Sequence, residues 1–464
     1  MNRIITESNQ TQDHSFVLKG HIVYTPSPEE MTCLPDHYLV CKEGYVEGVY
    51  QDLPQAAAHL PLYNCGDQII LPGMSDLHVH AGQYAYRGLG MDLELLDWLN
   101  EYAFPEEARF SDEDYAQKLY SLFAERVRHS TTTRLAAWGT IHAPATEILM
   151  AELAAAGLKG FVGKLNMDRN SSPAVTERTA SSLADTEAWI ERTKHRYPGI
   201  EPIITPRFIP SCTPELLQGL GELAARSGVR VQSHVSENLQ EIAWVADLEP
   251  EAQSYSGAYD RYGLFGSTVP VIMAHMVHPS PHEWELMLQR DVTIAHCPAS
   301  NMNVMSGLAP VKAFLDAGVQ VGLGTDVAGG FCISMCRAIT DAIQVSKLRA
   351  HLVATGQMAG ALSSVGGSAG VGQNREAEVA DTASAPRGQL TLTEGVWLST
   401  KGGGRFFGKV GSFEAGYEFD AVVVDDSALC KALTFNLTQR VERLIYLYPE
   451  VKVSAKYVAG KKVL

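Results

Sequence analysis

The sequence lacks the marks of a membrane-spanning or exported protein. Its longest apolar runs fall far short of the roughly 18 residues that a membrane-spanning helix needs. Met1–Asn9 has no signal-peptide pattern, and Lys461–Leu464 matches no recognised address signal. We therefore expect a cytoplasmic protein.

Positive charge and cysteine are both scarce. The chain has 37 Lys and Arg against 53 Asp and Glu, a formal charge of −16. This balance argues against a nucleic-acid backbone or an anionic membrane as a partner, so we expect a small-molecule substrate. The eight cysteines form no CxxC pair. Without a secretion signal, we interpret them as reduced thiols.

The length and composition are typical of a large globular enzyme or binding protein. A chain of 464 residues with 45% hydrophobic and 19% charged residues exceeds one small core. It indicates one large α/β unit and an accessory domain.

Short β-branched or apolar runs alternate with helical patterns along most of the chain. The eight expected strands are Ile69–His80, Thr131–Thr140, Lys159–Met167, Ile200–Phe208, Val229–His234, Pro270–His275, Asp291–His296 and Val319–Asp326. Helical segments between them include Ala145–Ala156, Ala180–Arg196, Thr213–Ser227, Pro281–Gln289 and Pro310–Ala317. Gly157, Gly228 and Gly318 stand where helices are expected to end. The alternation predicts an α/β fold, a (β/α)8 TIM barrel.

The two ends of the chain do not fit the barrel pattern. Strand-like pieces occur at Ser15–Lys19 and Tyr38–Cys41, and strands return at Asp420–Val424 and Val453–Val458. We expect a small β-sandwich domain formed from both termini, with residues 1–70 and 406–464 flanking a barrel of residues 71–405. Residues 359–387 are rich in Gly, Ala and Ser without periodicity, which predicts a flexible insertion.

The stretch Leu71–His80 contains the pair His78 and His80. On a strand, residues two apart face the same side, so the pair offers two imidazoles to one metal ion. The pair alone is weak support for a metal site because the chain has 15 histidines. The remaining ligands must come from elsewhere in the sequence.

The other strand ends supply them. In a (β/α)8 barrel, chemistry lies at the carboxyl ends of the strands. The polar residues expected there are His78, His80, Arg207, His234, His275, His296 and Asp326. The set of His78, His80, His234 and Asp326 provides three nitrogens and one oxygen, which suits Zn²⁺ with one position open for water. Glu237, three residues beyond His234, can reach the same water.

With these residues in view, the chain resembles the amidohydrolase superfamily and, within it, the guanine deaminase family. The likeness is carried by Pro72–Tyr84, Leu95–Leu99, Tyr102–Glu107, Thr205–Phe208, Gln232–Asn238, Ala295–Pro298, Ser300, Asn301 and Gly322–Gly330. The resemblance implies a zinc-dependent hydrolase acting on C–N bonds in cyclic amidines. It would convert guanine to xanthine and ammonia in purine catabolism or salvage, as a homodimer.

The resemblance also implies a role for each site residue. His78, His80, His234 and Asp326 would hold one zinc ion per subunit. A water molecule would attack C2 of guanine, with Glu237 as the proton shuttle and His275 and Asp326 as the other catalytic groups. The substrate would meet Gln83, Trp98, Arg207, Phe208 and Glu237. Members of the superfamily with two metals carry a lysine on the fourth strand, and Arg207 stands there instead, so a single metal fits better.

Several interpretations stay open at this point. His296 is either close to the metal or structural, Phe208 either stacks on the base or packs in the barrel, and Gln83 either contacts the ring edge or is a solvated loop residue. The reaction could instead be deamination of a pterin, cytosine or s-triazine, or opening of a cyclic amide. A non-enzymatic scaffold role is an additional possibility. The cytidine-deaminase type of zinc fold is excluded because the chain has no PCxxC.

Overall fold

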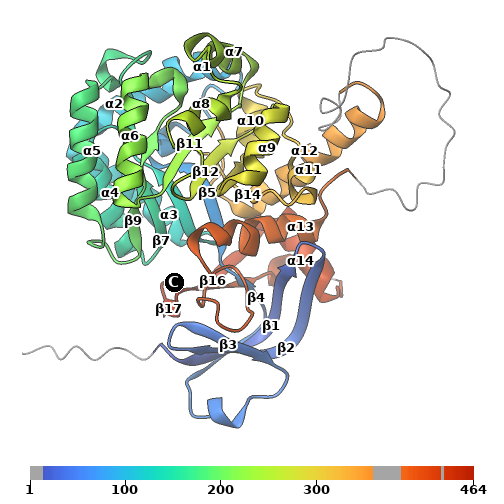
Figure 1. Ribbon diagram of the computed structural model, residues 1–464. Helices are drawn as coiled ribbons and strands as arrows, with labels where there is room; N and C mark the ends of the chain where they lie inside the picture. The colour runs from blue at the N-terminus through green and yellow to red at the C-terminus, as the bar shows by residue number, and fades with distance from the viewer. Residues whose placement is uncertain (1–13, 359–387, 430–432) are drawn as a thin grey trace, which may run out of the picture.

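The computed structural model describes residues 14–358, 388–429 and 433–464. They form a large α/β part, in the upper half of Figure 1, and a smaller part built on a β-sheet below it. Strands from both the blue N-terminal and the red C-terminal regions contribute to the smaller part. The insertion expected at 359–387 lies outside the described residues.

The large part is a ring of parallel strands. They are β5 (Met74–His80), β6 (Thr132–Trp138), β7 (Lys159–Gly163), β8 (Leu165–Asn166), β9 (Ile200–Pro202), β10 (Thr205–Pro206), β11 (Val231–Val235), β12 (Val271–His275), β13 (Val292–His296) and β14 (Val321–Leu323). A parallel bridge from Ile204 to Val231 joins the two halves, β5-β6-β7-β9 and β11-β12-β13-β14. Beyond β14, the Asp326 N–H donates to the His78 carbonyl (2.8 Å) and closes the ring. The predicted (β/α)8 class is confirmed, and each expected run contains a strand.

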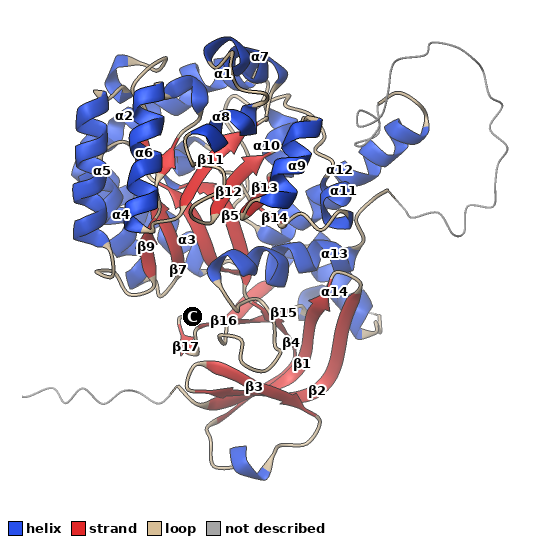
Figure 2. Cartoon of the chain, viewed as in Figure 1, coloured by secondary structure: helices blue, strands red, loops and turns tan. Residues whose placement is uncertain are grey.

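Helices surround this ring (Figure 2). They are α1 (Leu95–Trp98), α2 (Phe104–Ala108), α3 (Glu113–Arg128), α4 (Ala143–Ala155), α5 (Thr179–Thr193), α6 (Pro214–Ser227), α7 (Leu239–Leu248), α8 (Tyr255–Arg261), α9 (Pro281–Gln289), α10 (Pro298–Asn303), α11 (Val311–Asp316), α12 (Met335–Ala354) and α13 (Leu392–Trp397). In α3 the side chains of Leu119, Phe123 and Val127 are buried, the spacing of a helix with one apolar face. The helix α6 ends as expected at Gly228, which has φ of 68° and donates its N–H to Ala224 O.

The strand expected at Ile69–His80 is two strands in two different sheets. β4 (Leu62–Pro72) pairs with the small domain's strands, whereas β5 pairs with β6 in the barrel. Gly73 lies between them, where a Cβ atom would come within 2.2 Å of Thr133 Oγ1. The prediction of one strand is therefore wrong, because Pro72 and Gly73 form the junction between the two parts of the protein.

The smaller part is one seven-stranded sheet in the order β17-β16-β15-β4-β1-β2-β3. Besides β4, its strands are β1 (Phe16–Ser27), β2 (Glu30–Lys42), β3 (Tyr45–Tyr50), β15 (Ala421–Asp425), β16 (Lys452–Val458) and β17 (Lys461–Lys462). The side chains of Phe16, Leu39, Ile70, Phe419 and Tyr457 form its apolar core. The sequence analysis expected only strands in the C-terminal region and missed α14 (Leu437–Tyr446), which begins with a capping box at Asn436 and Gln439.

A buried ion pair ties the barrel to this sheet. Arg134, on β6, donates from Nε to Asp420 Oδ2 (2.6 Å) and from Nη2 to Glu418 Oε2 (2.9 Å). Lys159, at the start of β7, also reaches Glu418 (3.0 Å). The two parts are therefore held together by charge at the end of the barrel opposite the expected site.

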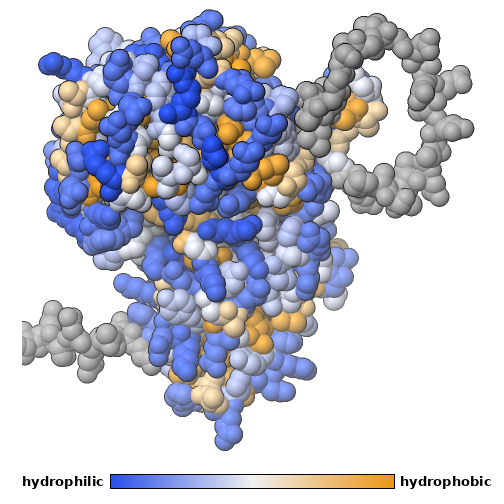
Figure 3. Space-filling view, in the orientation of Figure 1, coloured by the Kyte–Doolittle hydropathy of each residue, from blue (hydrophilic) through white to orange (hydrophobic). Residues whose placement is uncertain are grey.

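Hydrophilic side chains cover most of the face in Figure 3, with hydrophobic side chains in smaller groups among them. Within the described part of the chain, no helix has both the length and the apolar character needed to cross a membrane.

Candidate active site

Three imidazoles and a carboxylate meet at the carboxyl ends of the barrel strands. His78 and His80 occupy alternate positions at the end of β5, so their side chains leave the strand on the same face. His234 lies near the end of β11, and Asp326 follows β14. His78, His80 and Asp326 are buried and His234 is partly buried. The four ligands expected from the sequence are thus adjacent in space.

Three of the separations among their ligand atoms match those around a single tetrahedral ion. His78 Nε2 lies 3.1 Å and His80 Nε2 3.5 Å from Asp326 Oδ1. The Nε2 atoms of His80 and His234 lie 3.3 Å apart. Ligand atoms bound at about 2.0–2.1 Å to a tetrahedral zinc lie roughly 3.3 Å from one another. The residues present therefore fit a zinc ion between these atoms.

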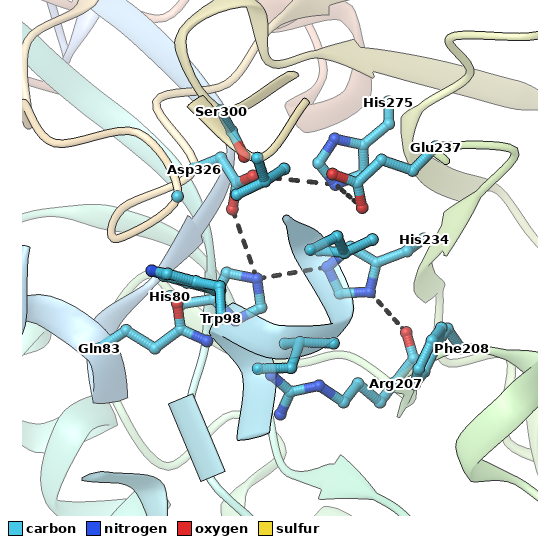
Figure 4. A pocket seen from close by; sticks show the side chains of 14 residues that line it. His80, Gln83, Trp98, Arg207, Phe208, His234, Glu237, His275, Ser300 and Asp326 are labelled. Atoms are coloured by element: carbon cyan, nitrogen blue, oxygen red, sulfur yellow. Dashed lines mark hydrogen bonds and ion pairs between the residues drawn. The ribbon is translucent and has the colours of Figure 1, made fainter. Parts of the chain in front are cut away.

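The hydrogen bonds of His234 show which nitrogen is free to bind a metal. Its Nδ1 lies 2.6 Å from the main-chain carbonyl oxygen of Arg207 (Figure 4). A carbonyl only accepts, so Nδ1 carries the proton and Nε2 carries the lone pair. Nε2 points toward His80 Nε2 (Figure 4). A cation between the two nitrogens would satisfy both.

Burial keeps these imidazoles neutral. It is the main cause that holds the pKa of His78, His80 and His234 well below the ordinary 6.5, and the positive charge of Arg207 acts in the same direction. Neutral imidazole is the form that binds metal ions. Burial also raises the pKa of Asp326 to about 6, which a bound cation would oppose.

The four residues His78, His80, His234 and Asp326 form a group that we call the ligand cluster. Glu237 and His275 lie together on the side of this cluster that is away from Gln83 and Arg207 (Figure 4). Glu237 Oε1 accepts a hydrogen bond from Ser306 Oγ (3.0 Å), and Oε2 lies 3.4 Å from His275 Nε2. His275 Nε2 also lies 3.8 Å from Asp326 Oδ2, and its Nδ1 is 2.8 Å from Asn301 Oδ1. Burial, followed by the charge of Asp326, raises the pKa of Glu237 to about 8. A carboxyl group with such a pKa can both accept and deliver a proton near neutral pH.

The backbone is strained at these strand ends. Positive φ angles occur at Ser236 (46°), His275 (78°), Met276 (45°) and Asp326 (46°). Residues other than glycine rarely adopt this region, and such strain gathers at functional sites. These φ angles persist only because the surrounding structure holds the backbone in place at the strand ends.

A second group of side chains forms the opposite wall of the cavity. The cavity is lined by His80, Gln83, Leu95, Trp98, Leu99, Arg207, Phe208, His234, Glu237, His275, Ser300, Val304, Asp326 and Gly329. Gln83 and Arg207 offer polar groups on the side away from Glu237, and Trp98 and Phe208 offer ring faces (Figure 4). All the residues expected at the substrate therefore line the same cavity as the ligand cluster.

His296 is not among the residues that line the cavity. It is fully buried at the end of β13, and burial lowers its pKa to about 3. Lys164 is likewise absent from the cavity lining, and it pairs with Glu177 and the Leu165 carbonyl.

Two residues that contact the site without lining the cavity were not predicted from the sequence. Glu107, at 1% exposure, accepts hydrogen bonds from Gln83 and Arg207. Ser306 holds Glu237. Glu107 lies in the Tyr102–Glu107 motif, which could have identified it, whereas Ser306 lies in a loop without a pattern.

Known proteins resemble this chain in sequence and in fold. The family model described as the Amidohydrolase family matches residues 69–463, and the chain belongs to this family. The resemblance inferred from the motifs is thereby confirmed.

Its relatives within that family include guanine deaminases. The guanine deaminase of Dictyostelium discoideum is 31% identical over 473 residues, 96% of this chain and 98% of that protein. The guanine deaminase of Mus musculus is 35% identical over 410 residues, which cover 86% of this chain and 83% of that protein. The crystal structure of guanine deaminase from C. acetobutylicum with bound guanine in the active site superposes with a TM-score of 0.87 at 40% identity, covering 97% of this chain and all of that one.

Proposed function

We propose that this protein hydrolyses guanine to xanthine and ammonia, using one Zn²⁺ per subunit held by His78, His80, His234 and Asp326. The observation that carries the proposal is the division of the cavity. Arg207 and Gln83 line one side, and the ligand cluster with Glu237 and His275 lines the other. A flat base between them can place its reacting carbon at the cluster and its far edge at Arg207.

When bound, the Zn²⁺ would supply Lewis-acid activation that lowers the pKa of a water molecule from 15.7 to about 7. Asp326 Oδ2 faces His275 and can accept a hydrogen bond from the attacking water. Glu237 takes a proton from this water through Oε2, because Oε1 is already engaged by Ser306.

The remaining steps belong to Glu237 and His275. The water oxygen bonds to C2, and Glu237 delivers the proton to a ring nitrogen next to C2. His275 Nε2, 3.4 Å from Glu237 Oε2, stabilises the oxygen as charge develops on it. The proton that remains on this oxygen then passes, again through Glu237, to the exocyclic amine. As the oxygen forms the C2 carbonyl, the C2–N bond breaks, and ammonia and xanthine leave.

Arg207 supports guanine over adenine as the base. Its guanidinium only donates hydrogen bonds, and guanine offers a carbonyl oxygen at C6, whereas adenine offers an amino donor there. A buried donor left unpaired is a large penalty for the wrong substrate. Trp98 and Phe208 contribute ring faces against which a base can pack.

The homodimer implied by the resemblance and the cytoplasmic location expected from the sequence are part of this proposal. Sedimentation of the purified protein and fractionation of cells that express it would test them. A monomer in solution would contradict the first, and recovery with membranes the second.

The activity is tested with the purified holoprotein, whose metal content is measured in the same preparation. We expect about one zinc per chain, and conversion of guanine to xanthine with release of ammonia. Adenine and cytosine should be nearly untouched, and a pterin with the same amide edge is the sharpest competing substrate. No turnover of guanine by the zinc-loaded protein would refute the substrate assignment.

A further inference from the structure

Glu107 connects two substrate-facing side chains from behind. Its Oε1 accepts a hydrogen bond from Gln83 Nε2 (2.9 Å), and its Oε2 accepts one from Arg207 Nη1 (2.5 Å). Gln83 and Arg207 line the cavity, whereas Glu107 is not among the lining residues. The exposed fractions of Gln83, Glu107 and Arg207 are 1%, 1% and 2%. Water therefore does not replace these contacts.

The contacts of Gln83 permit only one orientation of its amide. The Ala328 N–H donates to Gln83 Oε1 (3.1 Å), and a main-chain N–H cannot accept. On the other side, an ionised Glu107 cannot donate, so it must face the NH₂ group. Both neighbours require the same orientation. One N–H of Gln83 is therefore left to donate to a ligand, and its Oε1 keeps a second lone pair.

Arg207 is held in a similar way. The carboxylate of Glu107 fixes one end of its guanidinium, and the guanidinium carbon lies 5.1 Å from the centre of the Phe104 ring. An arginine has no acceptor, so its unpaired N–H groups also donate. The wall formed by Gln83 and Arg207 thus offers the free N–H donors of both side chains to the cavity, and Arg207 offers nothing but donors.

The local fold explains how this carboxylate comes to lie there. Leu95–Trp98 (α1), a π-helical turn at Leu99–Ala103 and Phe104–Ala108 (α2) follow one another without a break. Trp98 lines the cavity, and Glu107 lies at the far end of the same segment. π-Helical turns often occur at functional sites because they shift the following side chains around the helix.

We propose that Glu107 is the positioning residue that orients the N–H donors of Gln83 and Arg207 in this wall and so sets the preference for a 6-oxo over a 6-amino purine. This inference rests on the function proposed above. Guanine and 2,6-diaminopurine both carry the amine at C2 and differ at position 6, where one has an oxygen acceptor and the other an amino group. The N–H donors of Arg207 can pair with the oxygen of guanine, whereas they cannot pair with the amino group of 2,6-diaminopurine.

The test compares kcat/KM for guanine and 2,6-diaminopurine in the zinc-loaded wild type and two variants. Glu107→Gln removes the charge and cannot accept from both donors. We expect kcat/KM for guanine to fall roughly 10- to 100-fold, the effect of losing one charge-assisted hydrogen bond. The value for 2,6-diaminopurine should fall less, so the ratio of the two should drop. Glu107→Asp keeps the buried charge but is too short to reach both donors, so it should lower the ratio partly. This variant provides the test if Glu107→Gln does not fold.

Glu106→Gln is the matched control. Glu106 is the preceding residue of α2, but its carboxylate accepts from Arg109 Nη1 (2.9 Å) and the Tyr115 hydroxyl instead. Its substitution should leave the ratio unchanged.

Two outcomes would overturn the proposal. One is a Glu107 variant with wild-type values, and the other is an equal loss on both substrates, which would indicate a merely structural role. If the wild type deaminates guanine and the ratio does not change, only the role of Glu107 is refuted. If the wild type does not deaminate guanine, the proposed function fails as well.

Discussion

Replacing Glu237 by glutamine removes the proton carrier and keeps the shape of the side chain. Glu237 Oε1 accepts from Ser306 Oγ at 3.0 Å, and a glutamine oxygen can keep that bond. The amide nitrogen would then take the place of Oε2, 3.4 Å from His275 Nε2. The substituted side chain should therefore stay in place but be unable to carry a proton.

The expected loss is that of general acid–base catalysis. Such a group contributes typically 10²- to 10⁴-fold. At about 1.36 kcal/mol for each factor of ten, the barrier should rise by about 3–5 kcal/mol. Because the wall of Gln83 and Arg207 is unchanged, the loss should fall on kcat and leave KM for guanine within roughly threefold.

The assay follows guanine consumption and ammonia release, with zinc measured in the same sample. Glu285→Gln, on the exposed face of α9, is the control for the chemical change itself. If Glu237→Gln keeps more than a tenth of kcat, Glu237 is not the shuttle. If it loses its zinc, Glu237 has been wrongly placed outside the ligand set.

Three further perturbations test the site and the junction. Removing the metal with a chelator should abolish guanine turnover. Zn²⁺ but not Mg²⁺ should restore the activity, because a set of three nitrogens and one oxygen suits zinc. Recovery with Mg²⁺ would contradict the ligand set. Ser306→Ala should lower kcat roughly 10- to 100-fold while retaining zinc, because it removes a hydrogen bond that stabilises the carboxylate form of Glu237, the form that takes up the water proton. Unchanged kinetics would show that Ser306 does not hold the shuttle. Arg134→Ala should lower the free energy of unfolding in urea by about 3–5 kcal/mol, since it leaves Asp420 buried without its partner. Lys159→Ala, at a more exposed pair, should cost about 1 kcal/mol or less, and equal losses would refute the argument from burial.

The ligand cluster could be predicted from the sequence because each member ends a strand. The i, i+2 spacing of His78 and His80 depends only on the alternation of side chains along a strand. The parallel barrel then brings His234 and Asp326 to the same end, whatever lies between them in the sequence. The site can therefore be predicted because the parallel topology alone brings these strand ends together at one face of the barrel.

Two kinds of feature could not be predicted from the sequence. They are hydrogen bonds made by single side chains, and the point at which the chain passes from one sheet to another. Glu107 contacts the site through hydrogen bonds from Gln83 and Arg207, and Ser306 through one to Glu237. The periodicity of a sequence does not predict such bonds. The boundary at Gly73 was missed because β-branched and apolar residues continue on both sides of it, and only the close approach of Thr133 explains the glycine. His296 could not be placed because a strand end alone does not say whether a side chain reaches the cavity.

Arg207 takes part in the site through two chemically separate groups. Its side chain belongs to the wall of the cavity, whereas its main-chain oxygen orients His234. Any amino acid placed at this position keeps that carbonyl. Selection on the identity of the base can therefore act on residue 207 while the proton on His234 Nδ1 stays in place. The barrel could acquire a new substrate by exchanging one side chain without having to rebuild its catalytic centre.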